Sequence, residues 1–348
     1  MKQVRVLIVD DSAFMRKLIK EFLSEDPRII VIDTARNGQE AIDKTLKLKP
    51  DVITMDVEMP ILNGIDAART IMNSCPVPII MLSSTTKAGA ENTILAMEAG
   101  AIDFIAKPSG AISLDLHKVK NSLIEKVITS SKANIATKKA LSPYKLENNV
   151  QKKVLKREHK NKLVLIGTST GGPRALQQVI TMLPNDIDAP VVVVQHMPAG
   201  FTRSLADRLN SLSNVSVKEA ENHEQLQKGY VYIAPGGFHV QLYEKMGRLY
   251  VSLHKDDPVG GHRPAVNVLF SSASKLKDYQ KIAVIMTGMG SDGTEGIVDL
   301  KDAGSTVVIA EAEESCVVYG MPKAAVLTKK VDEVVHLESI GSAILNHL

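Results

Sequence analysis

The chain has no tryptophan, and aromatic residues make up only 4% of its 348 residues. Aliphatic cores are therefore expected, without the aromatic stacking platforms that bind single-stranded nucleic acid. No apolar run reaches transmembrane length, and Met1 to Val4 leads directly into a strand pattern rather than a signal peptide. The two cysteines, Cys75 and Cys316, form no metal or redox motif and are expected to be reduced packing residues. These absences predict a cytoplasmic protein with no membrane insertion.

Positive charge is concentrated in one segment rather than spread along the chain. The net charge is +3, but residues 131–160 contain nine Lys or Arg residues against Glu147 and Glu158. The rest of the chain is therefore slightly acidic, which argues against a nucleic-acid-binding domain. The segment has little apolar periodicity and contains Pro143, so residues 130–160 are predicted to be a basic flexible linker. Its charged residues could keep the linker solvated, or could contact a membrane surface or an acidic partner.

The length predicts two domains, and residues 1–129 show five repeats of an apolar run followed by a helical pattern. Such repeats predict a flavodoxin-like (βα)5 unit, a parallel α/β sheet with helices on both faces. The predicted strands are Val4–Val9, Ile29–Asp33, Val52–Asp56, Ile79–Leu82 and Ile102–Ala106. The predicted helices are Ala13–Ser24, Gly38–Leu48, Gly64–Asn73, Ala90–Ala99 and Leu114–Thr129.

Polar residues end several of these strands, at the sheet edge where α/β proteins place their active groups. Asp10 and Asp11 follow the first strand, Asp56 ends the third and Lys107 follows the fifth, while Ser83 or Ser84 follows the fourth. One such aspartate could simply cap a helix, but three carboxylates together repel one another unless a cation lies among them. Oxygen ligands favour Mg²⁺, and a nearby lysine and hydroxyl would stabilise an acyl phosphate.

Together with Met59-Pro60, Gly64 and Pro108, these residues make the segment from residue 3 to about 125 resemble a response-regulator receiver domain. The resemblance implies that Asp56 accepts phosphate from a histidine kinase. It also implies that Asp10 and Asp11 hold Mg²⁺ with Asp56, that Ser83 is the switch hydroxyl and that Lys107 contacts the phosphate.

Residues 161–348 predict a second α/β domain, mostly a parallel doubly wound sheet with an antiparallel hairpin attached. The hairpin is expected between Gly237 and Leu253. The predicted strands are Leu163–Ile166, Val191–Gln195, Val215–Lys218, Tyr230–Ala234, Ile282–Met286 and Ser305–Ile309. The predicted helices are Pro173–Met182, Gly200–Leu209, Arg263–Ser274, Gly293–Ala303 and Met321–Leu327.

Residues 167–171 of this domain, Gly-Thr-Ser-Thr-Gly, fit the G-x-S-x-G pattern that exposes a nucleophilic serine between a strand and a helix. Ser169 would be that nucleophile, although a generic glycine turn fits equally well. His196 and Asp292 also follow predicted strands, so they could act as its base and as the acid that orients the base. Alternatively, each could cap the helix that follows it. The order Ser, His, Asp differs from that of the α/β-hydrolases.

Four motifs, three of which contain these residues, are similar to the catalytic domain of the CheB family, whose members are chemotaxis protein-glutamate methylesterases. The motifs span residues 166–173, 195–198, 232–236 and 287–293. The resemblance implies hydrolysis of glutamate methyl esters on chemoreceptors, and often glutamine deamidation, by Ser169, His196 and Asp292. Backbone N–H groups near Thr170 and Met289 would bind the oxyanion, without a cofactor.

The same resemblance implies that the receiver blocks the esterase cleft until Asp56 is phosphorylated. We expect a monomer. One motif departs from the family, which more usually has Ser and Asp where Ala265 and Asn267 stand; only details of substrate contact depend on it. His262 and Arg263 are candidate substrate-side groups, or are simply solvated surface residues.

Two other functions fit the sequence less well. A dinucleotide enzyme would use residues 167–172 as a phosphate loop, but Ser169 replaces the second glycine of G-x-G-x-x-G. A transcription regulator would need a compact helical domain with a basic recognition helix, whereas the second domain is long and strand-rich.

Overall fold

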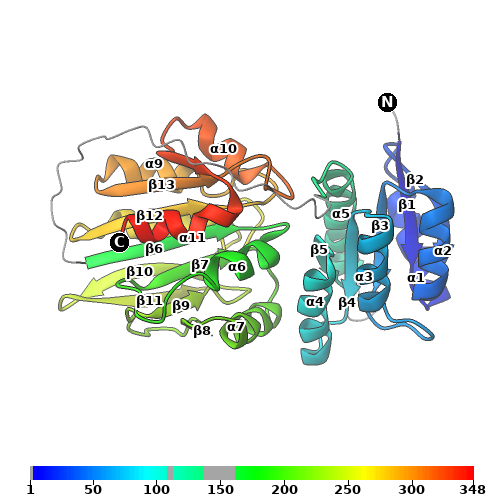
Figure 1. The fold of residues 1–348 in the computed structure, drawn as a ribbon, viewed down its shortest axis with the longest axis horizontal. Helices are drawn as coiled ribbons and strands as arrows, with labels where there is room; N and C mark the ends of the chain where they lie inside the picture. Colours follow the sequence, from blue (N-terminus) through cyan, green and yellow to red (C-terminus); the bar gives the residue numbers. More distant parts are fainter. Residues whose placement is uncertain (1–2, 108–112, 136–160) are drawn as a thin grey trace.

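The computed structural model describes residues 3–107, 113–135 and 161–348, so most of the predicted linker lies outside the described residues. Two α/β units lie side by side (Figure 1). None of the described helices is both long and apolar enough to span a bilayer.

The first unit is a five-stranded parallel sheet in the order β2-β1-β3-β4-β5, which is the flavodoxin-like order predicted from the sequence. Its strands are β1 (Val4–Val9), β2 (Ile29–Ala35), β3 (Val52–Asp56), β4 (Ile79–Ser83) and β5 (Asp103–Ala106). Its helices are α1 (Ala13–Ser24), α2 (Gly38–Leu48), α3 (Gly64–Ser74), α4 (Lys87–Ala99) and α5 (Ser113–Ser130). Both faces of the sheet are covered by helices, so β3 and β4 are buried along their whole length.

The second unit is a seven-stranded parallel sheet in the order β14-β13-β12-β6-β7-β9-β8, with β10 and β11 paired separately as the predicted hairpin. Its strands are β6 (Asn161–Thr168), β7 (Val191–Gln195), β8 (Ser216–Glu219), β9 (Tyr230–Ile233), β10 (His239–Lys245), β11 (Arg248–His254), β12 (Tyr279–Ile285), β13 (Thr306–Glu311) and β14 (Glu333–Val335). Its helices are α6 (Gly172–Ile180), α7 (Phe201–Leu212), α8 (Val266–Ser274), α9 (Thr294–Asp302), α10 (Met321–Leu327) and α11 (Leu337–Asn346).

The predicted elements differ from the structure mainly at their ends. Helix α8 begins at Val266 rather than Arg263, because a residue that precedes a proline, here Pro264, disfavours helical backbone. Helix α4 begins at Lys87, three residues before the prediction, where the Thr86 hydroxyl caps it. The sequence analysis did not predict β14, which has only three residues, or α11.

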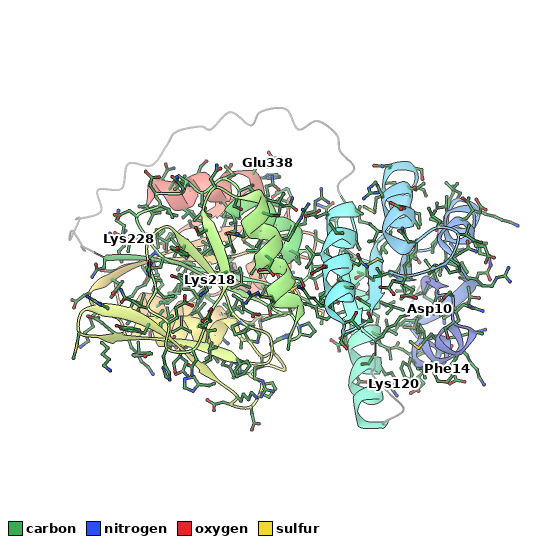
Figure 2. The ribbon with its side chains drawn as sticks, turned by 90° about the horizontal axis from the view of Figure 1, so that it is seen from below. Asp10, Phe14, Lys120, Lys218, Lys228 and Glu338 are labelled. Atoms are coloured by element: carbon green, nitrogen blue, oxygen red, sulfur yellow. The ribbon has the colours of Figure 1, made fainter. Side chains whose placement is uncertain are left out.

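The two units pack through β5, α4 and α5 of the first and α7 and the strand-end loops of the second. Phe104 of β5 contacts Phe201 of α7 with ring centroids 4.5 Å apart. Arg208 of α7 donates to both carboxylate oxygens of Glu98 on α4, at 2.7 and 2.8 Å. Asp10 lies beyond α4 and α5, away from the second unit (Figure 2). The predicted phosphorylation site is therefore set back from the junction between the units.

Candidate active site and phosphorylation site

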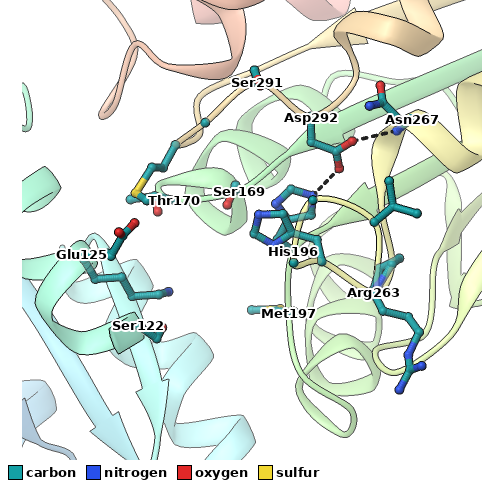
Figure 3. Close-up of a pocket in the computed structure, with 18 of the residues that line it drawn as sticks. Ser122, Glu125, Ser169, Thr170, His196, Met197, Arg263, Asn267, Ser291 and Asp292 are labelled. Carbon is teal, nitrogen blue, oxygen red and sulfur yellow. Dashed lines mark hydrogen bonds and ion pairs between the residues drawn. The ribbon is translucent and has the colours of Figure 1, made fainter. Parts of the chain in front are cut away.

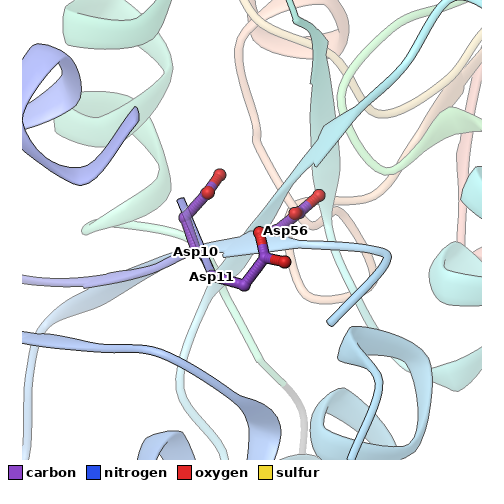
Figure 4. Close-up of side chains that lie close together, drawn as sticks. All are labelled: Asp10, Asp11 and Asp56. Atoms are coloured by element: carbon purple, nitrogen blue, oxygen red, sulfur yellow. The ribbon is translucent and has the colours of Figure 1, made fainter. Parts of the chain in front are cut away.

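The carboxyl ends of β1 and β3 bring together the acidic residues predicted from the sequence (Figure 4). Carboxylate oxygens of Asp10, Asp11 and Asp56 all lie within 4.8 Å of one another. The Lys107 ammonium lies 2.9 Å from Asp10 and 2.8 Å from Asp56. Burial raises the pKa of Asp56 to about 6, although the hydrogen bond from Lys107 acts in the opposite direction. Three converging carboxylates supply only hard oxygen donors, which fits Mg²⁺.

The predicted switch serine, Ser83, is buried at the end of β4. Its hydroxyl donates to the backbone carbonyl of Gly89 in α4, at 3.0 Å. The Ser84 hydroxyl instead pairs with Thr86. Ser83 therefore links β4 to the start of α4, which is one of the helices that pack against the second unit.

The candidate nucleophile lies on a tight turn between β6 and α6. Ser169 follows the last residue of β6, and Gly171 has a φ of 79°, a left-handed conformation that favours glycine. A Cβ at Gly171 would lie 2.7 Å from Val317. Ser169 itself does not have positive φ, so the left-handed residue of this turn is the glycine and not the serine. The turn is joined to the loop after β12, because the Ser169 N–H donates to the Thr287 carbonyl at 3.0 Å.

His196 and Asp292 form a direct hydrogen bond at the same sheet edge (Figure 3). His196 follows β7 and Asp292 lies in the loop after β12, and these strands flank β6. The His196 Nε2 atom is 2.8 Å from Asp292 Oδ2, and both side chains are buried. His196 Nδ1 is buried without a partner among the described residues. An ionised carboxylate only accepts hydrogen bonds, so Nε2 carries the proton and Nδ1 has a free lone pair.

The Asp292 carboxylate is fixed by two further donors from the start of α8. Oδ2 accepts the Val266 N–H at 2.6 Å and Oδ1 accepts the Asn267 N–H at 2.9 Å. Burial alone would raise the pKa of Asp292, but the hydrogen bond from His196 and these N–H groups hold it below its usual value. The acid therefore stays ionised, and its capping contacts are with α8 rather than with α9.

Asn267, one of the two residues that depart from the family motif, has a structural role beside Asp292. Its side-chain oxygen accepts the N–H groups of Gly293 and Gly296, at 2.9 and 3.1 Å, and so caps the start of α9. Its amide nitrogen lies 3.4 Å from Glu295. Ala265 is fully buried before α8. Asn267 thus acts on the site through the loop that carries Asp292.

Ser169, His196 and Asp292 line one cavity of about 910 Å³. In the part of the chain that the structure describes, the Ser169 hydroxyl has no hydrogen-bond partner. The backbone N–H groups of Thr170 and Met289 are likewise unpaired within the described ranges. Unpaired N–H groups on residues that line the same cavity as a free hydroxyl are candidates for binding an oxyanion.

The first unit reaches this cavity directly. Helix α5 contributes Ser122, Glu125 and Lys126 to its lining, opposite Ser169 (Figure 3). The Thr170 hydroxyl donates to the Asp103 carboxylate of β5, which also pairs with Lys126. These receiver residues were not predicted as site residues, because nothing in the sequence indicates which α5 face meets the second unit.

Residues of the first unit contact both the turn that carries Ser169 and the loop that carries Met289, which we call the oxyanion loop. The Gly171 N–H donates to the Ile102 carbonyl at 3.0 Å, next to the nucleophile. The Thr129 hydroxyl of α5 lies 3.0 Å from the Met289 sulfur. Both residues proposed to bind the oxyanion, Thr170 and Met289, therefore have side chains engaged by the first unit.

A buried carboxylate contacts the loop that follows β12. Glu311, at the end of β13, accepts the Thr287 N–H at 2.8 Å and the Ser315 hydroxyl at 3.0 Å. Burial raises the pKa of Glu311 to about 6. Thr287 in turn accepts the Ser169 N–H, so Glu311 is connected to the nucleophile through one residue. The sequence analysis missed it because an acidic residue inside a strand pattern gives no motif.

His262 and Arg263, the two candidate substrate-side residues, differ in their contacts. Arg263 donates to the carbonyls of Lys255 and Asp256, at 3.1 and 2.9 Å, and so braces its own loop. His262 stacks on His196 and faces the cavity. The fold and the cavity together define a two-domain α/β protein, in which helix α5 of a receiver-type unit lines a cavity that also contains a serine, a histidine and an aspartate, the residue types of many hydrolase sites.

Comparison with known proteins agrees with this class. Residues 164–344 match the CheB methylesterase family, and residues 6–118 match the response regulator receiver domain. A Geobacillus kaustophilus protein named protein-glutamate methylesterase/protein-glutamine glutaminase is 55% identical over 347 residues, covering 99% of each chain. The Bacillus subtilis protein of that name is 53% identical, over 98% of this chain and 97% of its own. The Thermotoga maritima CheB methylesterase catalytic domain, a crystal structure, is 46% identical with a TM-score of 0.52, covering 54% of this chain and 99% of that one.

The chain therefore belongs to the CheB methylesterase family and carries the receiver domain of a phosphorylation-regulated chemotaxis enzyme. Both resemblances drawn from the sequence are confirmed at the level of the family and the fold.

Proposed function

We propose that this enzyme hydrolyses glutamate methyl esters of chemoreceptors, and deamidates receptor glutamines, with Ser169 as nucleophile, His196 as base and Asp292 as orienting acid. The observation that carries the proposal is the His196–Asp292 hydrogen bond, which leaves Nδ1 of the imidazole unpaired in the same cavity as the free Ser169 hydroxyl. The relatives of the same length are named for both activities.

In the first half-reaction, His196 Nδ1 takes the proton of Ser169 as its oxygen attacks the ester carbonyl. Asp292 balances the imidazolium through the Nε2–H, and the N–H groups of Thr170 and Met289 bind the oxyanion. Collapse transfers the proton from Nδ1 to the leaving methoxide, which departs as methanol. Water then hydrolyses the acyl-serine by the same steps and yields the glutamate. With a glutamine substrate, ammonia leaves instead.

The receiver holds the enzyme in a closed, weakly active state, and phosphorylation of Asp56 shifts the population towards an open state. Three contacts support this proposal, since Asp103, Ile102 and Thr129 bind the nucleophile turn and the oxyanion loop. Helix α5 also lines the cavity into which a receptor segment must enter. Ser83 and Lys107 would detect the phosphate and change the position of α4 and β5.

Asp10, Asp11 and Asp56 would hold Mg²⁺, which would neutralise the incoming phosphate when bound. A chemotaxis histidine kinase is the proposed phosphodonor, and methyl-accepting chemoreceptors are the substrates. We propose a receiver domain over residues 1–129, a linker over 130–160 and a catalytic domain over 161–348, in a cytoplasmic monomer.

The purified chain should release methanol from methyl-labelled receptor membranes, and a small phosphodonor should raise the rate. No methanol above the rate of buffer alone, with or without phosphodonor, would contradict the proposed activity. Activity that is equal with and without phosphodonor would contradict the proposed regulation and leave the esterase assignment standing.

A further inference from the structure

The loop between β11 and α8 closes into a tight turn that holds His262. The Val259 N–H donates to the His262 carbonyl at 3.1 Å, and the His262 N–H donates to the Val259 carbonyl at 3.0 Å. The two residues between them, Gly260 and Gly261, have φ values of 59° and 83°. Consecutive left-handed residues form a two-residue turn that glycine adopts without strain. His262 is therefore fixed by its backbone at the edge of the cavity.

The His262 ring lies flat on the ring of His196. The ring centroids are 3.8 Å apart, and the planes differ by only 8°. Neither nitrogen of His262 has a hydrogen-bond partner among the residues that the structure describes. The contact is thus between ring faces, and it leaves both nitrogens of His196 available: Nε2 bonds to Asp292, and Nδ1 has no partner among the described residues.

The surroundings of His262 keep it uncharged. Burial, followed by the positive charges of His196 and Lys126, lowers the pKa of His262 to about 4, while Asp292 acts in the opposite direction. A histidine with this pKa is uncharged near neutral pH. The other charged groups that line the same cavity are Glu125 on α5, Glu295 on α9 and Arg263 in the loop itself.

We propose that His262 is a positioning residue for the esterase reaction, which acts by stacking on His196 and holding the plane of the catalytic imidazole. The inference rests on the proposed function of Ser169, His196 and Asp292. Asp292 restrains one edge of the His196 ring through a single hydrogen bond, about which the ring could still rotate. The His262 face removes that rotation, so that Nδ1 stays directed towards the serine.

The neutral state of His262 matters for the same step. His196 becomes positively charged when it takes the serine proton, and an uncharged aromatic face tolerates a cation at van der Waals distance. A second positive charge 3.8 Å away would oppose that proton transfer. The turn therefore supplies a flat, neutral surface for the catalytic base.

The test compares three replacements in the full-length chain, with methanol release from methylated receptor membranes as the assay. His262→Phe keeps a flat ring without nitrogens, whereas His262→Leu keeps bulk without a flat face and His262→Ala removes both. His223→Ala is the matched control, because His223 is an exposed histidine of the same domain that does not line the cavity.

We expect His262→Leu and His262→Ala to lower kcat about tenfold or more, with KM changed by less than about twofold, because ring orientation affects the chemical step. His262→Phe should retain at least about a third of the kcat. Its profile of kcat/KM against pH should superimpose on that of the native enzyme, since His262 does not titrate in that range. Thermal unfolding of each variant shows whether it is folded. If His262→Ala does not fold, His262→Leu alone provides the comparison.

The inference is overturned if the leucine and alanine variants match the kcat of the native enzyme, or if phenylalanine is as impaired as leucine. A second acidic ionisation that disappears in His262→Phe would also overturn it, because His262 would then change charge during catalysis. These outcomes differ from failure of the proposed function, in which Ser169→Ala would be as active as the native enzyme in the same assay.

Discussion

The bidentate ion pair between Arg208 and Glu98 joins α7 to α4 and is expected to stabilise the closed arrangement of the two domains. The donor–acceptor distances are 2.7 and 2.8 Å, and the side chains are 37% and 23% exposed. Exposure limits such a pair to about 1 kcal/mol, even with ideal geometry. If the open state is a small fraction of the enzyme, its population rises about fivefold when that stabilisation is lost.

Arg208→Ala and Glu98→Ala should therefore each raise methanol release without phosphodonor by about threefold to fivefold. The rate with saturating phosphodonor should stay nearly constant, because the open state already dominates there. Since the two residues stabilise the closed state through one interaction, the double variant should show little more basal activity than either single variant.

Arg203→Ala is the matched control, because Arg203 pairs with Asp207 on the same helix and does not cross the junction. The reasoning would be refuted if Arg208→Ala and Glu98→Ala had the basal activity of Arg203→Ala. Independent, additive gains in the double variant would show that the two residues do not act as a pair.

Three further predictions concern single carboxylates. Asp292→Asn should lower kcat about 10³- to 10⁴-fold, because an amide cannot accept from all three N–H groups that now meet the carboxylate; near-native kcat would contradict its role. Asp56→Asn should abolish the response of methanol release to a small phosphodonor while basal activity persists, and a full response would place the switch elsewhere. Glu311 has a raised pKa of about 6, so its stabilising contribution is complete below the unfolded pKa and is lost as the pH rises through 6. Glu311→Gln should therefore raise the free energy of unfolding by about 1–2 kcal/mol at pH 8 and by almost nothing below pH 4.5, measured by urea denaturation; equal gains at both pH values would contradict this.

Residues that end strands could be predicted well from the sequence. Parallel strands place their carboxyl ends at one edge, so Asp10, Asp56 and Lys107 had to converge once five βα units were recognised. The same reasoning brought Ser169, His196 and Asp292 to one edge of the second sheet. Their proximity follows from local patterns that each strand and turn carries by itself.

Contacts between the domains, and contacts made by irregular loops, could not be predicted in this way. The Thr170–Asp103 and Thr129–Met289 contacts join residues of different domains, and neither pair forms a motif. The stacking of His262 on His196 depends on a loop whose path is set by two left-handed glycines. Such contacts depend on how complete surfaces pack, which short-range patterns do not encode.

The central claim is that Ser169 attacks the ester, and methanol release by Ser169→Ala tests it most directly. The control is Ser291→Ala, which removes another hydroxyl from the lining of the same cavity. With methylated receptor membranes and saturating phosphodonor, Ser169→Ala should release no methanol above background, while Ser291→Ala should stay within about threefold of the native rate. Native activity in a folded Ser169→Ala variant would contradict the mechanism.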